Sequence, residues 1–478
     1  MKTTTSGLAI LVATLGMLNG AAAQQTEPPA AAPLRPYRMP TRQTATLPNG
    51  VTIAVVQQRA LPIITVRFIS DGGAMYDPPE KSGLALITAE MLREGTSTMT
   101  GPELATQMEK LGASFAPSGS YSLAQIQLTA LVPVFSQAFG LAAEVWMKPA
   151  FPAAELARVQ RQGIAGFEQA MAQVEGIAPR VFQKAVFDPR SPFSRGASGD
   201  ATTLAAITRD DVATWHRTNY VPGSTTLLFV GDIDMDAATR LAAQAMGAWT
   251  GTAPRVRQVI TSPRTATGTR VILVDRPGSA QSAIKVGGVG IGGGDPDLIP
   301  MTALNHVLGG GFNSRANMNL RERNGYAYGA FAEFATLRGA GWLDVYASVR
   351  TDATAAAISE ALMEYRRIVN EPIPAEELGA KVSNLVAGFP ATVQSVQGLA
   401  QRFSTVILYG LPLDFYATYR EKLAAVTPAQ AQAAARAHLP VTTPTIVAVG
   451  DLAMIEQPIR SLNLGTVEVW DRDGNRLR

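Results

Sequence analysis

Hydrophobic residues along the first half of the chain follow two spacings, which predict strands and then helices. Residues 63–70 (IITVRFIS) read as a strand, and the Pro48-Asn49-Gly50 turn separates two shorter strands. Helical spacing follows over residues 83–93, 101–111, 132–147 and 153–172. Because the strands are grouped beside runs of helices, without strict alternation, the pattern predicts an α+β fold with a mainly antiparallel sheet packed against helices.

A long-range repeat indicates two copies of one fold. Residues 204–232 and 423–451 align without a gap at an offset of 219 positions. Each segment holds a threonine suited to cap a helix (Thr208, Thr427), a helical stretch, a proline-containing turn and an apolar strand closed by Val-Gly-Asp. We therefore expect two homologous domains, over residues 44–253 and 265–478, with the boundary within residues 250–268.

The N-terminus has the pattern of a secretory signal. Lys2 precedes an apolar stretch over residues 8–18, and Ala21-Ala22-Ala23 has the small-x-small spacing of a signal peptidase site. A membrane anchor is the alternative, but the apolar stretch is shorter than the ~20 residues that span a bilayer. We expect a signal peptide over residues 1–23, a Pro/Ala-rich linker over 24–43, a periplasmic location, and no membrane span after the signal is removed.

The amino-acid composition argues against several classes of function. The 478 residues include 46% hydrophobic and 17% charged residues and carry a net charge of +3, with no long basic run, which argues against a dedicated nucleic-acid binder. The absence of cysteine excludes thiolate zinc sites and thiol nucleophiles. The three histidines, His216, His306 and His438, are far apart in sequence and are expected to be surface or structural residues.

The opening LPNGVTIAVV, the DGGAMYDPPEKSGLA stretch at residues 71–85 and both Val-Gly-Asp strands resemble the pitrilysin/insulinase family of zinc metallopeptidases. The resemblance implies that the following helix should carry an H-x-x-E-H motif, with two zinc-binding histidines and a glutamate base. Here those positions are Leu86, Ala89 and Glu90. The resemblance places a third ligand near residues 163–166, and Glu168 is out of frame. We therefore expect no metal and no peptidase activity in this chain alone, with Glu90 solvated or ion-paired.

The second copy keeps more of the family pattern. Residues 308–328 (LGGGFNSRANMNLRERNGYAY) resemble a family segment with a glycine-rich turn, here Gly309, Gly310 and Gly311, and an Arg and Tyr seven residues apart, here Arg321 and Tyr328. The resemblance implies that this pair binds substrate at the zinc-bearing half. In that interpretation, Gly325 ends the helix and leads Tyr328 into an extended segment. The alternative is a local ion pair for Arg321 and a packed strand aromatic at Tyr328.

We interpret the chain as the non-catalytic, substrate-binding subunit of a heterodimeric peptidase that degrades or processes unfolded peptides. A homologous H-x-x-E-H-containing subunit would supply zinc, and this chain would contribute Arg321 and Tyr328. The alternative is a stand-alone periplasmic peptide-binding or chaperone-like protein that adds peptides to a sheet edge. A hydrolase with another nucleophile is disfavoured because the sequence has no G-x-S-x-G motif.

Overall fold

The computed structural model describes residues 38–252 and 258–478. The expected signal peptide, its cleavage after Ala23 and most of the 24–43 linker lie outside the described residues, as do residues 253–257 of the expected domain boundary. The described residues belong to one compact unit. Within these described residues, no helix is long and apolar enough to cross a membrane.

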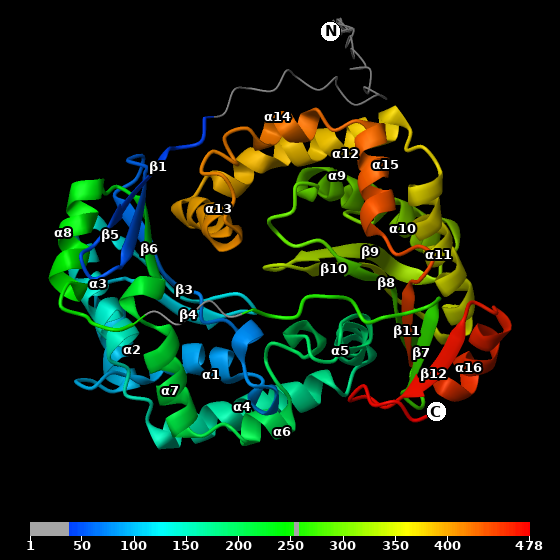
Figure 1. Ribbon diagram of the computed structural model, residues 1–478, viewed down its shortest axis with the longest axis horizontal. Coiled ribbons are helices and arrows are strands. Elements are labelled where there is room, and N and C mark those ends of the chain that lie inside the picture. The colour runs from blue at the N-terminus through cyan, green and yellow to red at the C-terminus, as the bar shows by residue number, and fades with distance from the viewer. Residues whose placement is uncertain (1–37, 253–257) are drawn as a thin grey trace, which may run out of the picture. The chain divides into compact units, whose positions relative to one another are not determined.

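The first half of the chain forms a six-stranded sheet in the order β1-β2-β6-β3-β5-β4 (Figure 1). Neighbouring strands are antiparallel except β2 and β6, which are parallel. The turn between the first two strands closes with a hydrogen bond from Gly50 N to Leu47 O (2.9 Å). The strands are β1 (Arg42–Thr46), β2 (Thr52–Gln57), β3 (Ile63–Ser70), β4 (Ser114–Gly119), β5 (Ala124–Leu131) and β6 (Thr225–Gly231).

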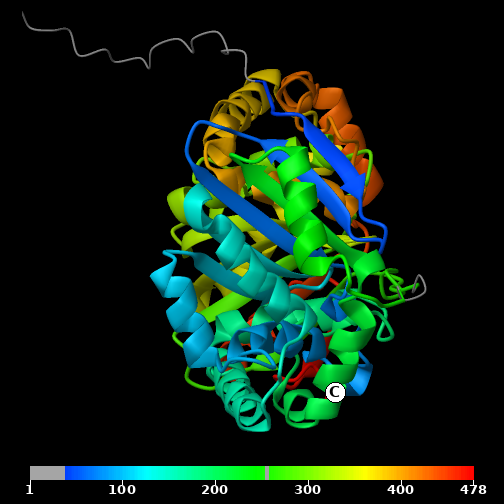
Figure 2. The same ribbon diagram turned by 90° about the vertical axis from the view of Figure 1, so that its left-hand side faces the viewer.

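The four predicted helical stretches of this half are helices in the structure, although the first ends in a 3₁₀ turn over Met91–Glu94. Helix α3 packs on the sheet, where Phe139 stacks on Phe68 of β3 with 5.3 Å between ring centroids. Figure 2 shows this half from the side of its sheet and covering helices. The helices are α1 (Leu84–Glu90), α2 (Gly101–Lys110), α3 (Val132–Met147), α4 (Ala153–Ala170), α5 (Val174–Val186), α6 (Ala201–Ala205), α7 (Arg209–Asn219) and α8 (Met235–Met246).

The second half forms another six-stranded sheet, in the order β12-β7-β11-β8-β10-β9. Its two parallel pairs both involve β7, and the remaining pairs are antiparallel, so the predicted α+β class is confirmed. The strands are β7 (Arg270–Asp275), β8 (Gln281–Gly290), β9 (Ala327–Thr336), β10 (Gly341–Arg350), β11 (Thr445–Gly450) and β12 (Thr466–Trp470). The helices are α9 (Leu298–Leu308), α10 (Arg315–Asn317), α11 (Thr354–Asn370), α12 (Ala375–Gly388), α13 (Val396–Tyr409), α14 (Tyr419–Ala424), α15 (Pro428–His438) and α16 (Leu452–Ser461).

The sequence repeat corresponds to equivalent elements in the two halves. Helices α7 and α15 begin and end at positions 219 residues apart. Each begins with the expected threonine cap in a capping box, Thr208 with Asp211 and Thr427 with Gln430. Each leads to an inner strand of its sheet, β6 or β11. The predicted duplication is therefore visible in the capping chemistry as well as in the topology.

Each half also contributes one helix to the sheet of the other half. Helix α5, from the first half, packs on β8 and β11, where Ile177 and Val181 join a buried cluster with Val447 and Val449. Helix α13, from the second half, packs on β3 and β6. There, the guanidinium of Arg67 on β3 donates to Gln401 Oε1 (2.8 Å) on α13. Since neighbouring side chains of a strand point to opposite faces, Arg67 and Phe68 show that α13 and α3 cover opposite faces of the first sheet.

Candidate functional site

Helix α1 carries the three positions at which the resemblance places the zinc motif, and Asp77 fixes where the helix begins. The Asp77 carboxylate accepts hydrogen bonds from the backbone N–H groups of Gly83 (2.8 Å) and Ala85 (3.0 Å). It therefore satisfies donors that have no partner within the helix. Burial raises the pKa of Asp77 to about 7, against the lowering effect of these two hydrogen bonds and of nearby Arg195.

Two of the three expected metal-site positions line one cavity, and only Glu90 among the three carries a potential metal-binding group. Leu86 and Glu90 line a cavity of about 560 Å³, and Gly163 and Gly166 of α4 lie on its wall. Ala89, at the position of the general base, is fully buried in the hydrophobic core and does not line the cavity.

The side chains present do not fit zinc. Leucine and glycine offer no side-chain lone pair, and Glu90 lies 3.2 Å from Arg93 in an ion pair. Glu168 lies outside the cavity and pairs with Arg472 at 3.0 Å. Arg180, a cationic group on the cavity wall, pairs with Asp200 at 2.8 Å. Neither a set of metal ligands nor an acid–base pair is assembled by the described residues here.

Two of the three histidines have clear structural partners. His216 is buried, its Nε2 lies 2.8 Å from the Trp146 carbonyl oxygen, and burial lowers its pKa to about 4. His438 ends α15 and its Nε2 lies 2.8 Å from a carboxylate oxygen of Asp297. His306 lies on α9, where burial lowers its pKa. None of the three lies on the cavity beside α1.

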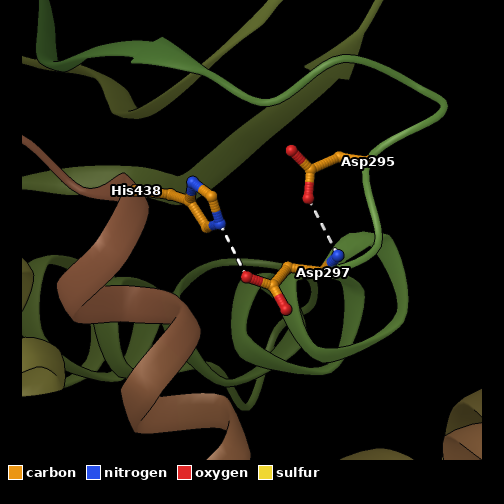
Figure 3. Close-up of side chains that lie close together, drawn as sticks. All are labelled: Asp295, Asp297 and His438. Atoms are coloured by element: carbon orange, nitrogen blue, oxygen red, sulfur yellow. Dashed lines mark hydrogen bonds and ion pairs between the residues drawn. The ribbon is translucent and has the colours of Figure 1, made fainter.

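Asp295 brings a second carboxylate beside the His438–Asp297 pair (Figure 3). The potential ligand atoms of the three side chains lie within 4.8 Å of one another. Asp295 also accepts a hydrogen bond from the backbone N–H of Asp297 (2.8 Å), so this contact stabilises the turn that leads into α9. His438 and Asp297 are 141 residues apart, and no sequence motif links them.

Arg321 and Tyr328 lie together on the second half of the chain. Gly325 adopts the left-handed conformation (φ 63°), and its N–H bonds to Arg321 O (3.0 Å), which ends the helical segment Met318–Arg323. Strand β9 then begins at Ala327, as expected for an extended Tyr328. The Arg321 guanidinium carbon lies 5.3 Å from the Tyr328 ring centroid, and Arg321 also pairs with Glu322 at 3.3 Å. Tyr328 is 87% exposed, so it is a surface residue and not a packed strand aromatic.

The glycine-rich turn lies against β9. Gly309 O accepts a hydrogen bond from Ala332 N (3.0 Å), and a Cβ at position 309 would lie 2.0 Å from that nitrogen. A Cβ at position 310 would lie 2.5 Å from His306 Nδ1, whereas one at position 311 would meet open space. Close approach therefore requires glycine at the first two positions. The turn leads directly to Phe312, which is 61% exposed.

Three further aromatic residues extend the Arg321–Tyr328 pair into an aromatic surface that sequence reasoning missed. The Arg321 guanidinium also lies 5.5 Å from the Phe312 ring, Phe312 contacts Phe331 at 5.7 Å, and Phe331 contacts Tyr346 at 6.1 Å. We call these five residues the β9 aromatic surface. No motif predicts it, because the residues come from a loop, a helical segment and two strands.

A β-bulge aligns the residues of this surface. Ala347 of β10 faces Ala330 while Val349 faces Ala327, so two residues of β9 oppose one residue of β10. Such an insertion reverses the alternation of side chains along a strand. Tyr328 and Phe331, three positions apart, can therefore face the same side.

Comparisons with known proteins identify the family of this chain. Residues 52–186 match the family model for insulinase (peptidase family M16), and residues 206–385 match the model for the peptidase M16 inactive domain. A crystal structure of the peptidase M16 inactive domain from Pseudomonas fluorescens is 27% identical in sequence and has a TM-score of 0.80. The match covers 86% of this chain and 98% of the chain in that structure.

Curated relatives are more distant in sequence. An uncharacterized zinc protease of Rickettsia bellii is 21% identical over 70% of this chain and 79% of its own length. The non-peptidase homolog YmxG of Helicobacter pylori is 22% identical over 77% of this chain and 84% of its own length. With both family models matched, the chain belongs to the M16 insulinase family, and its zinc-motif positions carry neither histidine.

Proposed function

We propose that this chain is the substrate-binding subunit of a heterodimeric zinc metallopeptidase that degrades or processes unfolded peptides. The observation that carries the proposal is the contrast between its two halves. The cavity beside α1 has lost every expected ligand, whereas Arg321 and Tyr328 are held side by side at the surface. A pair prepared for a substrate but remote from any catalytic group of its own chain is suited to act on the active site of a partner.

The chemistry of the pair fits a peptide in a partner's active site. A guanidinium offers several donors to a peptide carbonyl or carboxylate, and a phenol can donate to an oxyanion as charge develops. The stacking of Arg321 on Tyr328 restricts both side chains before substrate arrives. Within the described residues no hydrogen bond engages the Tyr328 hydroxyl, which leaves it available as a donor.

The partner in this proposal is a homologous chain that retains the H-x-x-E-H motif and carries the zinc. No metal is assigned to the present chain, because Leu86, Ala89 and the glycines of α4 supply no ligand. Under the same proposal, the signal-like N-terminus directs this chain to the periplasm, where the partner would meet it.

The test is peptide cleavage by the purified chain, alone and mixed with its H-x-x-E-H homologue, with and without a zinc chelator. We expect cleavage of unstructured peptides that is faster in the mixture than with the homologue alone and is abolished by the chelator. Chelator-sensitive cleavage by this chain alone would overturn the assignment. Equal rates with and without this chain would remove its role as a subunit.

A second candidate function rests on the edge position of β9. This strand has a neighbour on one side only, and the β9 aromatic surface lies along it. An exposed sheet edge can accept an extended peptide as an additional strand, with pockets or aromatic groups holding alternate side chains. A stand-alone peptide-binding or chaperone-like protein would bind unfolded peptides with equal affinity whether or not the homologue is present, which distinguishes it from the subunit.

A further inference from the structure

A second cavity, of about 510 Å³, shares no residue with the β9 aromatic surface, and most of its charged lining residues are basic. Helix α5 supplies two of them, the segment after the domain boundary supplies another, and the C-terminal tail after β12 supplies a further one. One carboxylate also lines the cavity. The charged lining residues are Arg180, Lys184, Arg195, Arg264, Arg476 and Asp200.

Only two of the five cations have a carboxylate partner among the described residues. Arg180 pairs with Asp200 at 2.8 Å, and Arg476 pairs with Glu468 at 3.6 Å. For the other three, no described carboxylate oxygen lies within 4.0 Å. We call Lys184, Arg195 and Arg264 the unpaired cations of this cavity.

The unpaired cations bond instead to neutral groups. Lys184 Nζ donates to the Asp473 carbonyl oxygen (3.0 Å) and to Asn475 Oδ1 (3.1 Å). Arg195 Nε donates to Ser82 Oγ (3.2 Å), and Arg264 Nη1 to the Lys184 carbonyl oxygen (3.5 Å). These bonds fix the side chains in place without neutralising their charge.

Partial burial makes the positive charges of these three side chains energetically unfavourable. Burial lowers the pKa of Lys184, with Arg180 as the second cause, and burial also lowers the pKa values of Arg195 and Arg264. Carboxylates outside the lining act in the opposite direction: Asp471 and Asp473 on Lys184, Asp77 and Glu80 on Arg195, and Asp188 and Glu468 on Arg264. Their attraction is incomplete, because each pKa remains below its ordinary value.

We propose that this cavity binds a small oxyanion of the phosphate class that carries two or more negative charges. A volume of about 510 Å³ suits a small molecule. Guanidinium groups match the oxygens of a phosphate through pairs of hydrogen bonds, and a lysine adds a compact point charge. Inorganic pyrophosphate has the size and charge to contact several of these donors at once.

The occupant would join three segments of the chain, of which the one carrying Arg264 is distant in sequence from the other two. Arg195 lies in the loop before α6, Lys184 on α5, and Arg264 in the segment that leads to β7. Lys184 also lies against the tail, since a Cβ at Gly474 would come within 2.7 Å of its Cδ atom. A ligand that binds only the folded arrangement of these segments stabilises it by mass action.

The test is calorimetric titration of the full chain with pyrophosphate, with inorganic phosphate as a second probe and sodium chloride at matched ionic strength as the salt control. We expect saturable pyrophosphate binding that is tighter than phosphate binding and raises the melting temperature. Lys184→Ala and Arg264→Gln should each weaken it by about tenfold, the usual loss for one charge-assisted hydrogen bond. Arg59→Gln is the matched control, because it removes one positive charge from an ion pair with Asp232 that does not line the cavity.

Three results would overturn the proposal. They are the absence of saturable pyrophosphate binding, equal weakening by Arg59→Gln and by the cavity variants, and displacement of pyrophosphate by an acidic peptide that binds more tightly. The melting temperature of each variant without anion shows whether its fold is intact. If Lys184→Ala fails to fold, Arg264→Gln and Arg195→Gln carry the test, because their side chains bond only to one neutral group each.

Discussion

The guanidinium carbon of Arg321 lies 5.3 Å from the centre of the Tyr328 ring, and the same guanidinium lies 5.5 Å from Phe312. One cation is therefore shared by two exposed aromatic rings. Exposed cation–π contacts contribute ~0.5–1 kcal/mol each, enough to restrict the side chains but not to explain the fold. This arrangement is the main reason to assign the second half a role in substrate binding.

The first prediction concerns the Tyr328 hydroxyl. In the assembled complex, Tyr328→Phe should lower kcat/KM for peptide cleavage by about tenfold to a hundredfold, because it removes one donor to the developing oxyanion. Assembly and zinc content should not change, since Tyr328 is 87% exposed. Tyr326→Phe is the matched control. It removes a hydroxyl two positions before Tyr328, and the Tyr326 side chain packs against the core. Full activity in Tyr328→Phe would exclude the role assigned to this residue.

The second prediction concerns the position of the lost general base. Ala89→Glu should lower the free energy of unfolding by about 2–5 kcal/mol, because a carboxylate would be buried without a partner in the core beside α1. Urea unfolding at neutral pH measures the change. Glu90→Gln, in the same helix, should cost less than about 1 kcal/mol, because its ion pair with Arg93 is largely exposed. Equal stability of both variants would show that α1 can expose position 89.

The third prediction concerns pH. Burial raises the pKa of Asp77 to about 7, so the folded chain holds a proton there in a range where the unfolded chain, with an ordinary aspartate, has lost it. The contribution of Asp77 to the free energy of unfolding is therefore fully present below about pH 4 and decreases as the pH rises to 7. Asp77→Asn removes this titration, so the stability of the wild type relative to the variant should fall by a few kcal/mol between these pH values.

The wild type must be compared with Asp77→Asn, because His216 changes the free energy of unfolding with pH in the opposite direction to Asp77. Its pKa is lowered to about 4, so its contribution is present above about pH 6.5 and is lost as the pH falls toward 4. This change is common to wild type and Asp77→Asn and cancels in their difference. Parallel stability curves from pH 4 to 7.5 would show that Asp77 does not titrate in this range.

The fourth prediction concerns the helix that the first half contributes to the second sheet. Phe182 of α5 is buried, and Lys285 Nζ of β8 lies 5.4 Å from its ring. Phe182→Ala should lower the free energy of unfolding by about 3–5 kcal/mol through the cavity it leaves. Fluorescence and circular dichroism should report one common transition, because the cluster joins α5 of the first half to strands of the second sheet. Two separate transitions would indicate that the halves unfold independently.

Local elements could be predicted from the sequence where a single spacing dominates. Strand β3 and helix α3 occupy the residues that the hydrophobic pattern predicts, and Thr208 and Thr427 cap the helices expected of them. Helix α5 did not stand out, because Pro179 lies inside it and its packing partners lie in the other half of the sequence. The hydrophobic pattern of a segment does not show which distant sheet the segment packs against.

The candidate site, like the fold, could be predicted from the sequence only in part. The resemblance to the peptidase family was enough to locate Leu86, Ala89 and Glu90, and to pair Arg321 with Tyr328. The β9 aromatic surface depends on a bulge and a turn that bring Phe312 and Phe331 together, and neither has a sequence motif of its own. The charged residues that line the basic cavity lie between positions 180 and 476, so its excess of positive charge is visible only in three dimensions.

The exchange of α5 and α13 has a consequence for how such a chain can have arisen. A single copy of the repeat, without its neighbour, would leave one face of its sheet without the helix that covers it. In a symmetric dimer of two identical copies, the helix of each copy would pack on the sheet of the other, so both sheets would be covered. Joining the copies into one chain freed each half from the requirement to stay identical, so equivalent positions of the two halves could take different side chains.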